Sequence, residues 1–235
     1  MNNITFPDGT VIQKPYKMNP WRGKHWYHFG DSTSCYANKN FPDYIAERTG
    51  VITHNLARAG AKIRNPGDNS IAVVEMATSS AWIPTTATVD ILTMVAGYNE
   101  RTTFVNDGDN TSWTGEMFVN GSLNYDKATV YGALDIIAKQ WYTYWPEATK
   151  AWFTIFPCHN DPNGKFELFI NDIIKEVGKY WNIPVFDAYN EVGLPVWMDE
   201  INEKYYMKDR IHLNDLGNYI ASKYVQAKVE TLMVK

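Results

Sequence analysis

The sequence predicts an α/β protein in which helices cover both faces of a parallel β-sheet. From Lys24 onward, short apolar runs alternate with longer amphipathic segments, a pattern typical of strands and helices that follow one another in such a sheet. The chain has 235 residues, 45% of them hydrophobic, which is enough to bury one substantial core. We find no internal repeat and no low-complexity segment. We therefore expect one α/β domain over residues 24–235.

The expected strands are short apolar runs, and the expected helices lie between them. We place strands at residues 25–29, 51–56, 89–95, 151–156 and 183–186. We place helices at residues 41–48, 71–79, 127–144 and 166–181, with a last helix from Asn214 or Asp215 to about residue 232. The segment from Arg101 to Asn124 is rich in Asp, Asn, Gly and Thr, so we expect a long loop there, and such loops are usually functional or mobile.

The first 23 residues differ from the rest. Ile4–Phe6 and Thr10–Ile12 flank a Pro7-Asp8-Gly9 turn, which predicts a small hairpin or an extended arm. Such an arm would suit a domain joined to a larger assembly, such as a phage tail protein or a modular surface enzyme.

Charge and hydropathy exclude several classes of partner. The net charge is -4, and the basic residues form no stripe able to neutralise a phosphate backbone, so we expect no nucleic acid partner. No stretch is long and apolar enough to span a bilayer, and the amino terminus lacks the pattern of a secretion signal. We expect a protein that is cytoplasmic, belongs to a virion, or is excised from a larger extracellular protein.

Residues with catalytic chemistry follow the expected strands at their carboxyl ends, where open parallel sheets bind ligands. Ser32 follows the first strand, and Asp209 and His212 come after the fifth. A serine hydroxyl becomes a nucleophile when a base takes its proton, and the base needs a third group to fix its tautomer. Ser32, His212 and Asp209 supply these three roles. The backbone N–H groups of Ser32 and Gly60 and the side-chain amide of Asn99 can hold the oxyanion that forms.

These blocks resemble those of the SGNH or GDSL-like hydrolases. The matching residues are Gly30-Asp31-Ser32, Gly60, Gly97-Tyr98-Asn99, and Asp209 with His212, and the resemblance covers roughly residues 24–235. It implies a flavodoxin-like three-layer α/β/α sandwich around a five-stranded parallel sheet of order 2-1-3-4-5. It also implies ester hydrolysis, often of acetyl esters, without a metal or organic cofactor. Two positions depart from the family pattern: Thr33 replaces Leu, and Glu100 replaces Asp, which puts the local turn geometry in question.

Each site residue also has a purely structural interpretation. Ser32 could cap a helix, Gly60 could be a turn residue with positive φ, and Asn99 could form an Asx turn. His212 could be a half-buried histidine bonded to a carbonyl, and Asp209 could pair with a neighbouring cation. Asn160 is a rival oxyanion donor but lacks a preceding glycine. Asp187 is a rival triad acid, but we expect it to hold a loop.

The cysteines and the first two histidines do not indicate a metal site or a disulfide framework. His25 and His28 are three residues apart in a strand, which sends their side chains to opposite faces. With strand order 2-1-3-4-5, Cys35 and Cys158 would lie about 9–10 Å apart, beyond the span of a disulfide, so we expect free thiols.

The expected substrate is an O-acetyl ester on a carbohydrate. The expected substrate-binding residues are Asp31, Tyr98, Trp113 and Trp197, the three aromatic residues serving as sugar platforms. The alternatives are a lysophospholipase or thioesterase acting on acyl chains, and a catalytically silent carbohydrate-binding domain.

Overall fold

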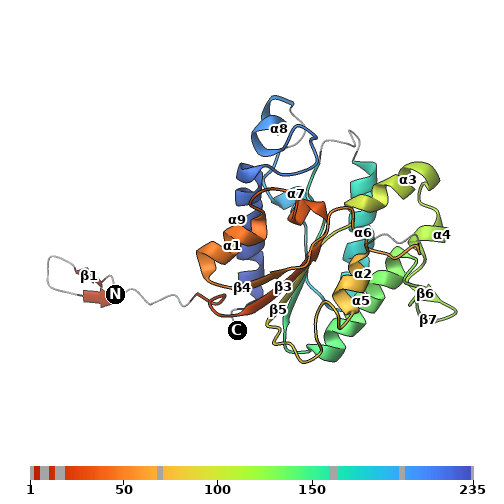
Figure 1. Cartoon of the computed structure of the whole chain (residues 1–235), viewed down its shortest axis with the longest axis horizontal. Helices are drawn as coiled ribbons and strands as arrows, with labels where there is room; N and C mark the ends of the chain where they lie inside the picture. The colour runs from red at the N-terminus through yellow and green to blue at the C-terminus, as the bar shows by residue number, and fades with distance from the viewer. Residues whose placement is uncertain are drawn as a thin grey trace.

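The computed structural model describes residues 3–5, 11–13, 19–67, 71–158, 164–195 and 199–233. Helices flank both faces of a five-stranded parallel sheet of order β4-β3-β5-β8-β9 (Figure 1). The strands are β3 (His25–Gly30), β4 (Ile52–Asn55), β5 (Ile91–Val95), β8 (Thr149–Phe153) and β9 (Val185–Phe186). Numbered along the chain within this sheet, the order is 2-1-3-4-5, so the predicted fold class is confirmed.

Near the amino terminus, β1 (Asn3–Thr5) and β2 (Val11–Gln13) pair antiparallel in a sheet of their own. They lie where the hairpin was predicted. The expected turn at Pro7-Asp8-Gly9 falls outside the described residues, and the division of the chain at residue 24 stays a prediction.

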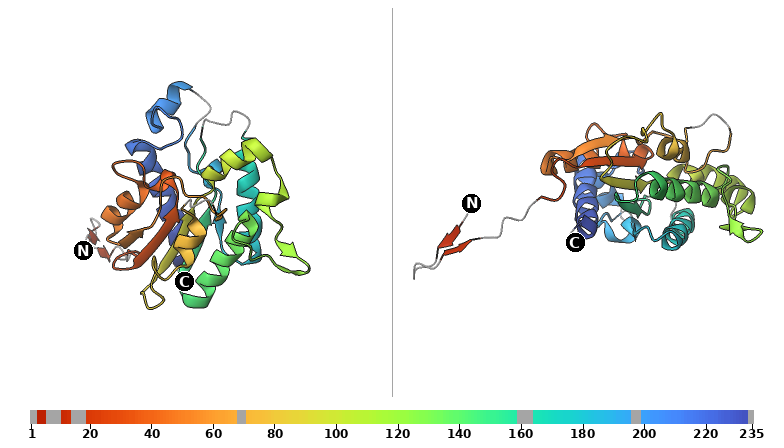
Figure 2. Two further views of the ribbon diagram at one scale, coloured as in Figure 1. Left: turned by 45° about the vertical axis from the view of Figure 1, so that its right-hand side comes forward. Right: turned by 90° about the horizontal axis from the view of Figure 1, so that it is seen from below.

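Two helical layers enclose the sheet (Figures 1 and 2). One layer consists of α1 (Phe41–Thr49) and α9 (Asp215–Met233), which pack against each other. The other consists of α2 (Val73–Thr78), α5 (Val130–Tyr144) and α6 (Lys165–Tyr180). Because successive strand residues face opposite sides of a sheet, Trp26 packs in the α1/α9 core and Tyr27 in the core under the other layer. No helix among the described residues has the length and apolarity to cross a membrane.

Local sequence explains where α1 begins and ends. The side chain of Asp43 accepts a hydrogen bond of 2.8 Å from the backbone N–H of Asn40, one half of a capping box, and Pro42 lies in the first turn, where its missing N–H costs nothing. Gly50 then ends the helix at φ 73°, in the left-handed region that glycine tolerates best.

The expected long loop from Arg101 to Asn124 is wrong. The segment contains α3 (Arg101–Asp107), α4 (Thr111–Thr114) and a hairpin of β6 (Phe118–Val119) and β7 (Ser122–Leu123). Asn120 and Gly121 turn the hairpin with positive φ values of 51° and 78°. Asn-Gly is a favoured two-residue hairpin turn, and here the polar composition around it obscures the signal.

Three short helical segments lie near the carboxyl ends of the strands. The turns η1 (Ser32–Ser34) and η2 (Tyr98–Glu100) directly follow β3 and β5, and α7 (Ala188–Glu191) follows β9. A further helix, α8 (Asp199–Tyr205), precedes the loop that carries His212. Neither Cys35 nor Cys158 takes part in a disulfide, as predicted, and Cys158 Sγ donates a 3.1 Å hydrogen bond to Glu167 Oε1.

His28 is a buried histidine inside the sheet. Its Nδ1 lies 2.8 Å from the Thr93 hydroxyl, which also accepts a 2.7 Å hydrogen bond from Trp26 Nε1. All three side chains are fully buried. Burial lowers the pKa of His28 to about 3, because the charged imidazolium cannot be hydrated there.

This burial predicts that acid destabilises the fold through His28. His28 takes up a proton near pH 6.5 in the unfolded chain but only near pH 3 in the folded chain. Protonation of His28 therefore does not affect stability above pH 6.5, and it increasingly favours the unfolded chain as the pH falls from 6.5 to 3. We expect the free energy of unfolding to decrease by on the order of 1 kcal/mol per pH unit in this window. Urea unfolding of the wild type and His28→Phe across it should show a shallower pH dependence for the variant, and parallel curves would contradict the prediction.

Candidate active site

Ser32 lies in a tight turn directly after β3. Gly30 ends the strand in a position where an added Cβ would lie 2.7 Å from the Val95 carbonyl oxygen and 2.8 Å from Ser34 Oγ, so only glycine fits. Asp31 then caps η1, because one carboxylate oxygen accepts hydrogen bonds from the Thr33 backbone at 2.9 Å and hydroxyl at 2.7 Å. The turn therefore has a single well-defined conformation.

Asp31 also ties this turn to the one after β5. Its second carboxylate oxygen accepts a 3.3 Å hydrogen bond from the backbone N–H of Tyr98. Asp31 is fully buried, and burial raises the pKa of its carboxyl, opposed by hydrogen bonds from Thr33, Tyr98 and Gly97. The expected role of Asp31 in substrate binding is therefore wrong, because its side chain is inaccessible and accepts hydrogen bonds from the backbone N–H groups of Thr33 and Tyr98.

Asp209 and His212 form a preorganised pair in the loop before α9. His212 Nδ1 lies 2.7 Å from Asp209 Oδ2, while Oδ1 accepts hydrogen bonds of 3.0 Å from the backbone N–H groups of Ile211 and His212. A bridge between Tyr206 and Leu213 closes the base of the loop. Burial acts to raise the pKa of Asp209, but the hydrogen bonds outweigh it and hold the pKa below its usual value. Asp209 is thus an anion that fixes the imidazole with its other nitrogen, Nε2, pointing away.

Two segments far apart in the sequence meet at this site. The Tyr36 ring stacks on the His212 ring with a centroid distance of 4.0 Å and an interplanar angle of 20°. The backbone N–H of Tyr36 donates a 3.0 Å hydrogen bond to the Ser32 carbonyl, so the Ser32 turn and the His212 loop touch through this residue.

His212 Nε2 is buried and has no hydrogen-bond partner among the described residues. The structure therefore shows no hydrogen bond between the Ser32 hydroxyl and this nitrogen, although the sequence analysis assigns the Ser32 proton to His212. Among the described residues, no other group competes for the nitrogen.

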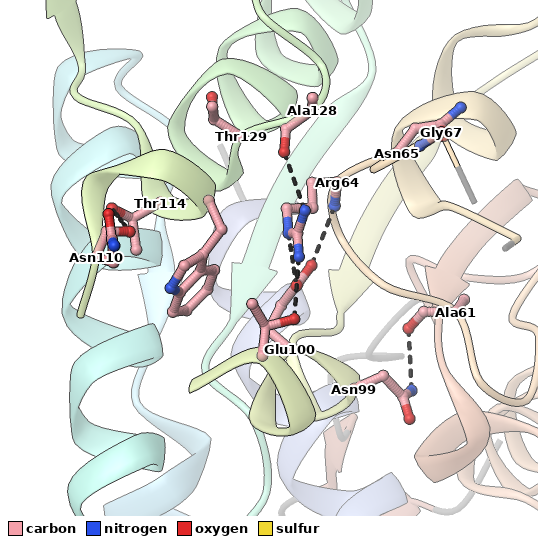
Figure 3. A network of polar contacts seen from close by, with 12 residues as sticks. Ala61, Arg64, Asn65, Gly67, Asn99, Glu100, Asn110, Thr114, Ala128 and Thr129 are labelled. Carbon is pink, nitrogen blue, oxygen red and sulfur yellow. Dashed lines mark hydrogen bonds and ion pairs between the residues drawn. The ribbon is translucent and has the colours of Figure 1, made fainter. Parts of the chain in front are cut away.

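Two of the three predicted oxyanion donors, Gly60 and Asn99, come from the loops after β4 and β5. Backbone hydrogen bonds from Leu56 to the His28 carbonyl and from Arg58 to the Gly30 carbonyl hold the loop after β4 against the Ser32 turn. Gly60 lies in that loop at φ 79°. The Asn99 side chain donates a 3.0 Å hydrogen bond to the carbonyl of Ala61, next to Gly60 (Figure 3). This bond uses one of the two N–H donors of the amide.

Glu100 and Arg64 join the same two loops by a buried ion pair (Figure 3). Arg64 Nε donates to Glu100 Oε2 at 3.0 Å, and the Arg64 backbone N–H donates to Oε1 at 3.3 Å. Arg64 also donates to the Thr103 hydroxyl and the Ala128 carbonyl. Burial raises the pKa of Glu100, opposed by Arg64. Glu100, where the resemblance leads one to expect Asp, therefore has both carboxylate oxygens hydrogen-bonded to Arg64, in the loop that also contains Gly60.

The three aromatic residues expected to stack on a sugar have different surroundings. Trp113 is 3% exposed, packs against Phe169 and donates a 3.0 Å hydrogen bond to the Gly108 carbonyl, so it is a core residue and the platform role is wrong. Tyr98 is half-buried against Phe166. Trp197 lies outside the described residues.

The two rival residues have different outcomes. Asp187 caps α7 and lies 2.8 Å from Lys175 Nζ, which confirms that it holds a loop. Asn160 lies outside the described residues. Among the residues with described side chains, no three His, Cys, Asp or Glu residues gather in a metal-binding arrangement.

Comparison with known proteins shows the fold. No family model and no curated protein matches the chain. A solved structure from Lactobacillus plantarum is 20% identical, with a TM-score of 0.70 over 89% of this chain and 98% of its own. A possible lipase from Chitinophaga pinensis is 17% identical, with a TM-score of 0.61 over 90% and 99%. An acetyl xylan esterase from Geobacillus stearothermophilus is 12% identical, with a TM-score of 0.56 over 93% and 100%. Further structures with this fold are a lipase/acylhydrolase from Enterococcus faecalis and a protein from Parabacteroides merdae described as a putative GDSL-like lipase. The chain therefore has the fold of the SGNH or GDSL-like hydrolases.

The buried ion pair yields a stability prediction. Glu100→Gln leaves the Arg64 guanidinium, only 8% exposed, without its anion, and we expect the free energy of unfolding to decrease by about 3–5 kcal/mol. Replacing both partners, with Arg64→Met and Glu100→Leu, should recover most of that loss, because no uncompensated charge remains.

Urea unfolding midpoints measure both effects. Lys127→Met is the matched control, since it breaks an exposed ion pair with Glu75, and should change stability by less than about 1 kcal/mol. A cost for Glu100→Gln no larger than that of the control would show that the pair does not hold the two loops.

Proposed function

We propose that this chain is a serine esterase that hydrolyses carboxylic esters through an acyl-enzyme on Ser32. The observation that carries the proposal is the Asp209–His212 pair, bonded at 2.7 Å. Its Nε2 is buried and has no partner in the described part of the chain, and the imidazole packs through Tyr36 on the turn of Ser32. The fold shared with lipases and an acetyl xylan esterase supports it.

The proposed mechanism has two steps. His212 Nε2 takes the Ser32 proton, the hydroxyl oxygen attacks the ester carbonyl, and the N–H groups of Ser32, Gly60 and Asn99 hold the oxyanion. The C–O bond to the alcohol breaks as His212 returns the proton to the leaving oxygen. A water molecule, deprotonated by His212, then attacks the acyl-enzyme. The bond between the acyl carbon and Ser32 Oγ breaks as His212 returns the proton to Oγ, which releases the acid and regenerates Ser32.

We further propose an O-acetyl group on a carbohydrate as the substrate. An open groove of about 440 Å³ begins at Tyr36 beside the site and is lined by Tyr36, Asn38, Met207, Asn214, Asp215 and Leu216. The exposed side chains of Asn38 and Asp215 offer hydrogen-bonding groups to the hydroxyls of a sugar. The exposed Tyr36 ring, 55% accessible, provides a face on which a sugar can stack.

Replacing the nucleophile tests the reaction class. Ser32→Ala should reduce hydrolysis of nitrophenyl acetate to the chemical background, because no other group forms the acyl-enzyme. Ser112→Ala, which removes an exposed hydroxyl on α4, is the control and should retain the wild-type rate. Retained activity in Ser32→Ala would refute the assignment.

Removing the amide of Asn99 tests the oxyanion site. Asn99→Ala should decrease kcat by about 10²–10³-fold with little change in KM, because the donor acts mainly on charge that develops in the transition state. Steady-state kinetics with nitrophenyl acetate measure both constants. A decrease in kcat of less than about tenfold would remove Asn99 from the oxyanion site.

Chain-length selectivity separates acetyl esters from lipid esters. We expect the highest kcat/KM for nitrophenyl acetate, a steady decrease through the butyrate and octanoate esters, and acetate release from acetylated xylan. Ser32→Ala is the blank for acetate release. A rate that increases with acyl length would instead support the lysophospholipase or thioesterase alternative.

A further inference from the structure

Tyr36 lies in an unusual position for a largely exposed aromatic residue. It is 55% exposed, yet its ring covers the His212 ring at 4.0 Å with the planes 20° from parallel. The ring therefore covers one face of the imidazole and leaves its own outer face toward the groove that contains Asn38 and Asp215.

The contact joins the two halves of the site. Tyr36 is four residues from Ser32 and bonded to its carbonyl through the backbone, whereas His212 is held by Asp209. The Asp209 hydrogen bond fixes one edge of the imidazole, and the stack restrains rotation of its plane. Together they direct Nε2 inward, and the His212 side chain is only 15% exposed.

The charge on His212 changes during turnover. In both steps the imidazole becomes an imidazolium, and a cation over an aromatic face is attracted by the quadrupole of the ring. The charged groups close to His212 in the sequence or at the site are Asp209, bonded to Nδ1, the flanking Lys208 and Arg210, and Asp215 in the groove. The buried Asp31 lies next to Ser32 on the opposite turn.

We propose that Tyr36 is a positioning residue for the esterase reaction: its ring orients the His212 imidazole toward Ser32 and stabilises the protonated form that arises in each step. This inference rests on the proposed function. It assigns to Tyr36 a role in proton transfer beyond that of a groove wall.

Two substitutions separate the effect of the aromatic electrons of Tyr36 from the effect of its side-chain volume. Tyr36→Phe keeps an aromatic face over His212, whereas Tyr36→Leu keeps an apolar cover without a quadrupole. Because a cation–π contact at such a site contributes about 0.5–1 kcal/mol, we expect the pKa of His212 to be about 0.4–0.7 unit lower in Tyr36→Leu than in Tyr36→Phe. NMR titration of the His212 ring measures this shift without any ester present.

Kinetics test the consequence for the reaction. The acid limb of the pH profile of kcat/KM for nitrophenyl acetate should move to lower pH by the same amount in Tyr36→Leu, and kcat should decrease about two- to fivefold relative to Tyr36→Phe. Tyr144→Leu, which removes an exposed tyrosine at the end of α5, is the control and should leave pKa and rate unchanged.

The outcomes distinguish this inference from the proposed function. Equal His212 pKa values in Tyr36→Leu and Tyr36→Phe would overturn the role of Tyr36, whether or not the protein hydrolyses esters. A His212 pKa that differs between the two variants, together with a wild-type protein that hydrolyses no ester, would refute the proposed function and leave the stacking contact established. A shifted pKa with equal rates would also overturn the inference, since the stack would not act on turnover.

Discussion

The parallel register of β3, β4 and β5 is the constraint on which the site depends. His28 pairs with Asn55 and Gly30 with Val95, so the three strands deliver their following loops to one edge of the sheet. Parallel strands align their carboxyl ends, and ligands in such folds bind beyond those ends. A shift of one residue in this register would exchange the faces of every side chain on a strand and separate the Ser32 turn from the Asn99 turn.

Buried polar groups convert this register into a defined site. Asp31 connects the turns after β3 and β5, and Glu100 with Arg64 connects the turn after β5 with the loop after β4. Each such group loses hydration when buried, so it is tolerated only because its hydrogen bonds are made within the protein. The resulting loops hold their backbone donors in place before a substrate arrives, which is the condition for electrostatic stabilisation of a transition state.

The sequence predicted the strands and the main helices well because these elements have strong periodicity and clear caps. It singled out Ser32, Asp209 and His212 because each lies in a short block beside a strand end or a helix start, and their catalytic roles stay predictions. The local contacts of Asp209 and His212, three residues apart, follow directly from their spacing. The ion pair between Arg64 and Glu100 was missed since its partners are 36 residues apart. The sequence signal for this pair is Glu100 itself, because an acidic residue in a turn that becomes buried needs a cation or hydrogen-bond donors nearby.

Exposure was the property that the sequence predicted least well. Trp113 was placed on the rim because it lies in a polar segment, but that segment folds into short helices that bury the indole. Tyr36, which the sequence analysis does not select, is an aromatic residue that the fold leaves exposed at the site. In the sequence, only its proximity to Ser32 indicates that Tyr36 lies at the site. Its contact with His212 depends on the packing of segments far apart in the sequence.

The proposed reaction requires that Ser32 is a nucleophile activated by His212. Treatment with a fluorophosphonate, followed by peptide mass spectrometry, tests this requirement most directly. We expect one adduct, on Ser32, whose formation slows sharply in His212→Ala. An unlabelled Ser32 in the folded wild-type protein, or labelling that His212→Ala does not slow, would contradict it.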